Sequence, residues 1–302
     1  MRMPSFQGIF TALVTPFTKT QEIDWIAWEN LLRNQLEAGV HGVVLAATTG
    51  ESATLNKEEK KELIQTTIAF FKKNPSNLQI IASTGSNNTE ETLEFSAWAS
   101  EQGVDALLLV TPYYNRPSQT GLKNHFLQVA NHVRCPIILY QVPLRTGVEL
   151  EPKTIASLAE HPRIQGLKDA SGRLTLISEV LERVPLFKML IGDDFHFLPA
   201  WALGCSGVVS VASNLIPKSM VKCHRMLLEG QFSEALKIHN RFYPLFRDLF
   251  IESNPAPVKA GLHTLGWCEK ILRPPLAQLN ESHEHQLQLT LKKCAITPGE
   301  LL

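Results

Sequence analysis

The chain has 302 residues, 44% of them hydrophobic, and its 29 lysines and arginines balance 29 aspartates and glutamates. That length can bury one large core, and zero net charge gives no reason to expect nucleic acid, a membrane surface or a polyanion as partner. Five scattered cysteines favour reduced thiols over a disulfide framework or a zinc site. The start, "MRMPSFQGIFTALVTPF", reads as neither a signal peptide nor a membrane span, so we expect a soluble, cytoplasmic protein.

Short apolar runs alternate with longer helical patterns along the chain. The runs are nearly continuous in apolar residues, which is typical of strands in a parallel sheet covered on both faces. In chain order they are "GIFTALVTPF", "HGVVLAATTG", "QIIASTGS", "ALLLVTPYY", "PIILYQVP", "IQGLKDASG", "FKMLIGDD" and "GVVSVASN".

The segments between the runs carry signals for helix starts. Asp24 is placed to cap a helix whose apolar residues recur at helical spacing. Asn56 with Glu59, and Asn88 with Glu91, have the spacing of a capping box.

Eight strand–helix units, without a glycine-rich dinucleotide turn after the first strand, favour an α/β fold of the closed (β/α)8 TIM barrel type over an open doubly wound sheet. From about residue 216 the strand signal stops and the pattern becomes helical, with "NPAP" and "RPP" as breaks. We therefore predict a barrel over residues 1–230, carrying the active site, and a C-terminal helical extension over 231–302.

The active site of such a barrel gathers at the carboxyl ends of the strands. Those ends read "TPF", "TTGES", "STGSN", "TPYYN", "YQVPLRTG", "KDASG", "GDD" and "SVASN". They are rich in hydroxyls and small residues, and the polar groups that need explaining gather at this end.

Lys168 ends the apolar run "IQGLK", although lysine is rarely buried unless it is paired or used. Desolvation can lower a lysine pKa from ~10.4 by up to about 3–5 units, leaving a free amine that can form a Schiff base with a carbonyl. The alternative is a salt bridge to Asp169. Lys188, at the start of its strand, should face the other end of the barrel and have no chemical role.

Tyr140 ends the preceding strand, which places its phenol beside Lys168 if neighbouring strands are adjacent. There it could shuttle protons and hydrogen-bond the hydroxyl of Thr48, although a rim tyrosine reaching for water is the alternative. Tyr113 and Tyr114 in "TPYYN" could contact either a partner subunit or the substrate.

Arg145 in "PLRTG" could hold a substrate carboxylate, or could be a solvated loop residue. The "TTGES" turn also suits a carboxylate. Asp193 and Asp194 in "GDD" would repel a phosphate, which favours a carboxylated substrate.

A metal site is not expected. His283 and His285 are two residues apart and would point to different sides of a helix. His125 and His132 lie seven apart on a predicted helix, and a packed or solvated histidine explains both. Only His196 approaches a strand end.

Together these motifs resemble the dihydrodipicolinate synthase family, pyruvate-dependent aldolases that work through a Schiff base. The similar stretches run from "GIFTALVTPF" to "NPAPVKAGL" and include "TTGESATL", "VTPYYNRPSQ", "RTG", "GDD" and "GVVSVASN". The resemblance implies a (β/α)8 barrel and a homotetramer built as a dimer of tight dimers. It also implies condensation of pyruvate with L-aspartate 4-semialdehyde to 4-hydroxy-tetrahydrodipicolinate, on the route to diaminopimelate and lysine, with no cofactor beyond the covalent imine.

The resemblance also implies residue roles. Lys168 corresponds to the imine-forming lysine and Tyr140 to the acid/base tyrosine beside it. Thr48 and Tyr114 correspond to the other members of a proton relay, with Tyr114 reaching in from the partner subunit. The substrate-binding positions are Thr49 for the pyruvate carboxylate, Gly192 and Val209 for the lining of that pocket, and Arg145 for the carboxylate of the semialdehyde.

Three positions depart from the family pattern. Ala47 replaces a usual glycine, Gln141 a usual asparagine, and Leu144 a small residue. Because positioning errors of about an ångström can cost about a hundredfold in rate, these changes bear on efficiency more than on reaction class.

Some family members are inhibited by lysine at a dimer-interface site, which Ala53, Asn87, Glu91 and Tyr113 match. Lys57 and Lys60 stand where sensitive members tend to carry histidine. Two extra ammonium groups would oppose a cationic ligand, so we expect weak or absent inhibition.

Two other functions stay open from the sequence. A sister aldolase acting on a sugar acid, such as N-acetylneuraminate, would keep Lys168 and Tyr140 but would not require Arg145. A non-catalytic sensor of a keto acid or of lysine would have no need for a nucleophile.

Overall fold

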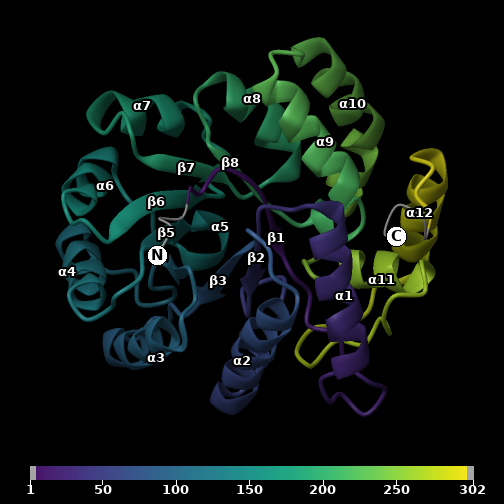
Figure 1. The fold of residues 1–302 in the computed structure, drawn as a ribbon, viewed down its shortest axis with the longest axis horizontal. Helices are drawn as coiled ribbons and strands as arrows, with labels where there is room; N and C mark the ends of the chain where they lie inside the picture. The colour runs from purple at the N-terminus through teal and green to yellow at the C-terminus, as the bar shows by residue number, and fades with distance from the viewer. Residues whose placement is uncertain (1–4, 298–302) are drawn as a thin grey trace. The chain divides into compact units, whose positions relative to one another are not determined.

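The computed structural model describes residues 5–297, in which eight strands form a closed parallel barrel in chain order, β1 to β8 (Figure 1). The strands are β1 Gly8–Ala12, β2 Gly42–Leu45, β3 Gln79–Ser83, β4 Ala106–Val110, β5 Ile137–Gln141, β6 Ile164–Asp169, β7 Lys188–Ile191 and β8 Gly207–Ser210. Each lies within one of the eight apolar runs, so the predicted TIM barrel is confirmed.

Helices follow the strands and continue beyond β8. They are α1 Trp25–Ala38, α2 Lys57–Lys73, α3 Thr89–Gln102, α4 Gln119–Ala130, α5 Pro143–Thr146, α6 Pro152–Ala159, α7 Thr175–Arg183, α8 Phe197–Ala202, α9 Pro217–Leu228, α10 Phe232–Asp248, α11 Ala256–Thr264 and α12 Glu281–Lys293. Two 3-10 turns, η1 Asp194–His196 and η2 Ala212–Asn214, follow β7 and β8. The expected helical tail is therefore present, while a domain boundary at residues 230/231, between α9 and α10, stays a prediction.

The chain divides into two compact units, and each is described by itself. Within the described residues, one comprises 5–7 and 79–209, and the other 8–78 and 210–297. In the first unit α3, α4, α6 and α7 lie outside the strands as neighbours in that order (Figure 1). In the second, α9 packs on β1, α1 and α10, and α12 packs on α10 and α11.

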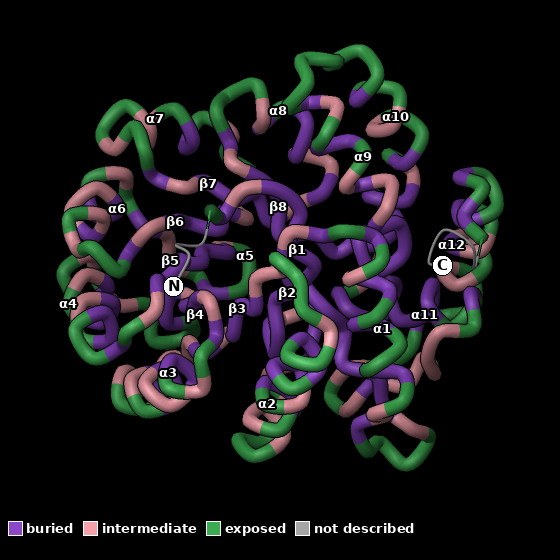
Figure 2. The backbone as a smooth tube through the Cα atoms, viewed as in Figure 1, coloured by how far each residue is buried: buried purple, intermediate pink, exposed green. Residues whose placement is uncertain are grey.

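Burial explains why the strands are nearly all apolar. The residues of β1, β2 and β8 are all buried, whereas helices such as α2 and α10 have exposed outer faces (Figure 2). A strand covered on both faces has no polar side, so it loses the alternation of an exposed sheet.

Helix starts follow the capping chemistry, with one exception. The Asp24 carboxylate accepts from Ala27 N at 3.0 Å, and Asn56 and Glu59 form the predicted reciprocal box. The predicted capping box at Asn88 is only half right: the Asn88 side chain caps α3, but the Glu91 side chain does not accept from the Asn88 N–H. Glu91 accepts from Ser86 Oγ at 3.4 Å, while the Asn88 N–H donates to Ser86 Oγ at 3.0 Å. The serine two residues before the cap therefore takes the donor that the box would use.

Candidate active site

Lys168 and Tyr140 are neighbours on adjacent strands in the first unit. The register of β5 and β6 pairs Tyr140 with Lys168 directly. Lys168 is buried, with 6% of its surface exposed, and its Nζ lies 4.1 Å from the centroid of the Tyr140 ring. Among residues 5–297 no ion pair joins Lys168 to Asp169, so the salt-bridge explanation is not supported. Lys188 begins β7 as predicted.

Gly192, directly after β7, packs against the Lys168 side chain. A Cβ added there would lie 2.7 Å from the Cβ of Ala170 and 3.2 Å from Cε of Lys168. Real Cβ atoms do not approach other atoms as closely as 2.7 Å, so this position requires glycine. The missing side chain leaves room for the lysine methylenes to lie against the backbone.

Gln141 and Asp169 form a buried polar link beside the Tyr140–Lys168 pair. Gln141 Nε2 donates to Asp169 Oδ1 at 2.8 Å, and its Oε1 accepts from Leu150 N at 3.0 Å. The Asp169 carboxylate also accepts from the N–H and the hydroxyl of Ser171. Burial raises the pKa of Asp169, and these donors oppose the rise. Gln141 thus joins the end of β5 to the end of the loop that follows it.

That loop carries Arg145 on the single turn α5. Arg145 and Leu144 are both exposed, and 97% of the Leu144 surface is accessible. Gly147 ends the turn in the left-handed conformation, at φ 69°, and its carbonyl accepts from Arg116 Nε at 2.8 Å. Arg145 is therefore exposed on a turn that a hydrogen bond holds in place.

The "TPYYN" loop after β4 holds two exposed tyrosines. Tyr114 adopts φ 71° and exposes 90% of its surface, and Tyr113 is also exposed. Asn115 Nδ2 donates to the Asn87 carbonyl at 2.9 Å, which ties the loop to the start of α3. Neither tyrosine lies on a helix or strand that would bury it.

The acidic pair after β7 separates into two environments. Asp194 is fully buried, whereas Asp193 is half-buried with an oxygen 3.7 Å from Nδ1 of His196. Burial raises the pKa of Asp193, and the positive charges of His196 and Lys168 oppose that rise. Val209, in β8, is also buried in this unit.

In the second unit, β2 is followed by a turn that we call the threonine turn, residues 48–51. Thr49 is buried and Thr48 half-buried. Thr15 Oγ1 donates to the Gly50 carbonyl at 2.7 Å, and Asn254 Nδ2 donates to Thr49 Oγ1 at 2.9 Å. The left-handed residue before the turn is Ala46, at φ 50°, one position before Ala47.

The buried ion pair between Lys259 and Glu51 is the main feature that sequence reasoning missed. Both side chains are fully buried, and Lys259 Nζ donates to Glu51 Oε1 and, at 2.8 Å, to the Ile271 carbonyl. The only signal was that "TTGES" and "NPAPVK" both belong to the quoted motifs.

The positions matched to the lysine site lie on loops and helix starts. In the second unit Ala53 and Lys57 are exposed and Lys60 is half-buried; in the first, Glu91 and Tyr113 are exposed and Asn87 is half-buried. A hollow of about 830 Å³ in the first unit is lined by Asn87, Asn88, Thr89, Glu90, Leu93, Tyr114, Asn115 and Gln128.

The described residues contain no cluster of three or more histidine, cysteine, aspartate or glutamate side chains that could hold a metal ion. His125 is buried in α4, but His132 lies beyond the end of that helix, so the prediction that one helix carries both was wrong. Within residues 5–297 no helix is both long enough and apolar enough to cross a membrane.

Comparison with known proteins places the chain in a family. The model of the dihydrodipicolinate synthetase family matches residues 5–294. A 4-hydroxy-tetrahydrodipicolinate synthase from Leptospira biflexa is 43% identical over 277 residues, covering 91% of this chain and 93% of the relative.

Two solved structures are similar over nearly their whole length. Dihydrodipicolinate synthase from Acinetobacter baumannii, complexed with pyruvate, has a TM-score of 0.93 and 38% identity, covering 96% of this chain and 99% of that one. The enzyme from Cyanidioschyzon merolae with lysine bound has the same TM-score and identity, with 96% and 98% covered. The chain belongs to the dihydrodipicolinate synthetase family.

Proposed function

We propose that this protein is a lyase, a 4-hydroxy-tetrahydrodipicolinate synthase that condenses pyruvate with L-aspartate 4-semialdehyde in diaminopimelate and lysine biosynthesis. The observation that carries the proposal is the buried Lys168, aligned with Tyr140 and packed against Gly192, in a chain of this family. The names of its relatives support the reaction.

In the proposed mechanism the Lys168 amine adds to the ketone carbon of pyruvate, and loss of one water leaves an imine. Loss of a proton from the pyruvate methyl group then gives an enamine, whose carbon attacks the aldehyde carbon of the second substrate. The amino group of that substrate then adds to the imine carbon and displaces the Lys168 amine, which closes the ring of the product and frees the enzyme. Tyr140 is the proposed carrier of protons to and from these intermediates, because its ring lies against the amine. The protonated imine itself serves as the electron sink, so the proposal needs no cofactor.

The remaining roles rest on the family resemblance. Thr48 and Tyr114 would complete the proton relay, and Thr49 would bind the pyruvate carboxylate, with Gly192 and Val209 lining that pocket. Arg145, exposed on α5, would bind the carboxylate of the semialdehyde. The 90% exposure of Tyr114 supports a role that a second subunit completes, within the proposed homotetramer. A cytoplasmic location accords with the free cysteines.

The test is to incubate the protein with pyruvate and borohydride and to measure intact mass and peptide masses. A reduced pyruvyl adduct on Lys168 is expected in the wild type, and none in the matched variant Lys168→Met. Untreated enzyme, supplied with pyruvate, would then be assayed with L-aspartate 4-semialdehyde and with the aldehyde partners of sugar-acid aldolases. Absence of an adduct on folded protein would overturn the proposal in favour of a keto-acid or lysine sensor, and turnover of a sugar-acid substrate alone would indicate the sister aldolase.

We also propose that lysine inhibits this enzyme weakly or not at all. Lys57 and Lys60 both lie in the first turn of α2, close to Ala53 in the chain, and added positive charge there opposes a cationic ligand. A lysine titration of the initial rate tests this, with Lys57→His as the matched variant. Strong inhibition of the wild type at low lysine concentration would contradict the proposal.

A further inference from the structure

The threonine turn has a conformation that its own residues do not favour. Glu51, which ends it, lies in the left-handed region at φ 56°, and so does Ala46 before it. Residues other than glycine persist there only where the surroundings fix them. Contacts from outside the turn must therefore hold it.

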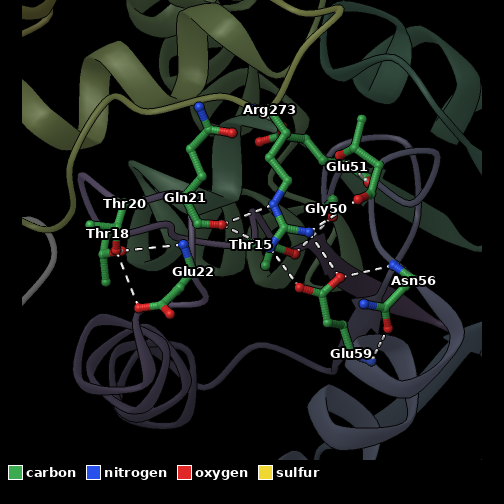
Figure 3. Close-up of polar contacts among 11 residues, drawn as sticks. Thr15, Thr18, Thr20, Gln21, Glu22, Gly50, Glu51, Asn56, Glu59 and Arg273 are labelled. Carbon is green, nitrogen blue, oxygen red and sulfur yellow. Dashed lines mark hydrogen bonds and ion pairs between the residues drawn. The ribbon is translucent and has the colours of Figure 1, made fainter.

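The C-terminal extension provides those contacts. The Glu51 carboxylate is bound through one oxygen by the Lys259 ammonium, on α11, and through the other by the backbone N–H of Arg273, at 3.1 Å. The same unit supplies the Thr15 hydroxyl to the Gly50 carbonyl (Figure 3). The last two residues of the turn, Gly50 and Glu51, are therefore both held by contacts from outside it.

The Arg273 side chain is itself anchored, which fixes the position of the backbone N–H that donates to Glu51. Its guanidinium forms a two-pronged ion pair with Glu59, at 2.6 and 2.8 Å, and donates to the Gln21 carbonyl (Figure 3). Lys259 and Arg273 also lie over the Phe17 ring, at 4.1 and 4.4 Å from its centroid. Planar, two-pronged pairing fixes an arginine more strictly than a single contact does.

Asn254, just before α11, acts on the chemistry of Thr49 itself. Both residues are buried, and the amide Nδ2 donates to Oγ1 of Thr49 at 2.9 Å. A hydroxyl has one proton to donate and two lone pairs to accept with. With a lone pair occupied by the amide, the hydroxyl proton is left for another acceptor.

We propose that Asn254 is a positioning residue that makes the Thr49 hydroxyl a hydrogen-bond donor to the pyruvate carboxylate, on a turn held by the Lys259–Glu51 pair. This inference rests on the proposed function, because it takes Thr49 as the pyruvate-binding residue. It assigns the C-terminal extension a part in pyruvate binding through Asn254, Lys259 and Arg273.

The experiment measures adduct formation on Lys168 with borohydride over a range of pyruvate concentrations. Asn254→Asp should raise the pyruvate concentration for half-maximal labelling at least tenfold, because a carboxylate only accepts and would take the Thr49 proton. Asn254→Ala should raise it several-fold with full labelling at saturation. In a Thr49→Val background, Asn254→Ala should have no further effect. The surface variant Asn131→Asp, with the same change of charge, should behave as wild type.

The outcomes separate the two proposals. Absence of labelling in the wild type overturns the proposed function and this inference with it. Labelling of the wild type with an unchanged half-saturation in both Asn254 variants overturns the inference alone, as does an equal effect of Asn254→Ala with or without the Thr49 hydroxyl. If the aspartate variant does not fold, the alanine variant and its Thr49→Val background decide.

Discussion

Lys259 and Lys168 are both buried, but they differ in whether a carboxylate pairs with the amino group. Lys259 is fully buried beside a carboxylate and a carbonyl oxygen. Lys168 is almost as buried, yet among residues 5–297 it has no carboxylate within ion-pair distance, and its amine lies over the Tyr140 ring.

The difference bears on the role proposed for Lys168. A paired ammonium is stabilised and is unavailable as a nucleophile, whereas a buried lysine without a carboxylate partner lacks that stabilisation. Burial lowers the pKa of Lys259, and Glu51 opposes that fall. Burial alone therefore does not identify a catalytic lysine, whereas burial without a paired carboxylate does point to one.

Replacing Lys168 should have the largest effect on activity and little on stability. Lys168→Met removes the proposed nucleophile, so the rate of product formation should fall at least about a thousandfold. The melting temperature should stay the same or rise, since a buried polar group without a carboxylate partner is exchanged for an apolar chain. Rate assays and thermal unfolding check both, with Lys188→Met as the control expected to keep its activity. A variant retaining a tenth of the rate would refute the assignment.

Replacing Lys259 should lower stability far more than replacing Lys168 does. Lys259→Met leaves the buried Glu51 carboxylate unpaired, so the free energy of unfolding should fall by about 3–5 kcal/mol. Urea unfolding measures it. Replacing both partners, with Lys259→Met and Glu51→Leu together, should restore most of the loss, because no buried charge is then left alone. A single variant within about 1 kcal/mol of wild type would show that the pair is not needed.

The two lysines also show which features of the protein could be predicted from its sequence. The position of Lys168 near a strand end was predictable, because an apolar run that ends in a lysine is a local pattern in the sequence. The Lys259–Glu51 pair joins residues 208 positions apart, and no local pattern specifies such a contact. At Asn88 the spacing was right, but Ser86 competes for the same donor, and competition of that kind depends on backbone geometry.

Gly192 tests how strictly Lys168 is positioned. In Gly192→Ala the new methyl group must displace the Lys168 side chain or Ala170, which lies nearest. A displacement of about an ångström should cost about a hundredfold in rate. The second change Ala170→Gly should recover part of it by removing the closest atom. Steady-state kinetics measure both, and an unchanged rate in Gly192→Ala would mean that the lysine tolerates movement.

His125 extends the comparison to a buried base outside the strand ends, and the expected effect is the smallest. Its Nδ1 lies 2.9 Å from Thr89 Oγ1, and burial lowers its pKa from 6.5 to about 4. As the pH falls below 6.5 the unfolded chain binds a proton that the folded protein does not, so stability present near neutral pH is lost towards pH 4.

Between pH 7 and about pH 5.5 that difference amounts to about 1 kcal/mol. His125→Gln keeps an amide for the threonine and does not titrate, so its free energy of unfolding should fall by about 1 kcal/mol less than that of the wild type over this interval. Other buried histidines, such as His224, titrate alike in both proteins and cancel. Equal slopes for wild type and His125→Gln would show that His125 takes up its proton in the folded protein, because the loss arises only from a proton that the folded state refuses.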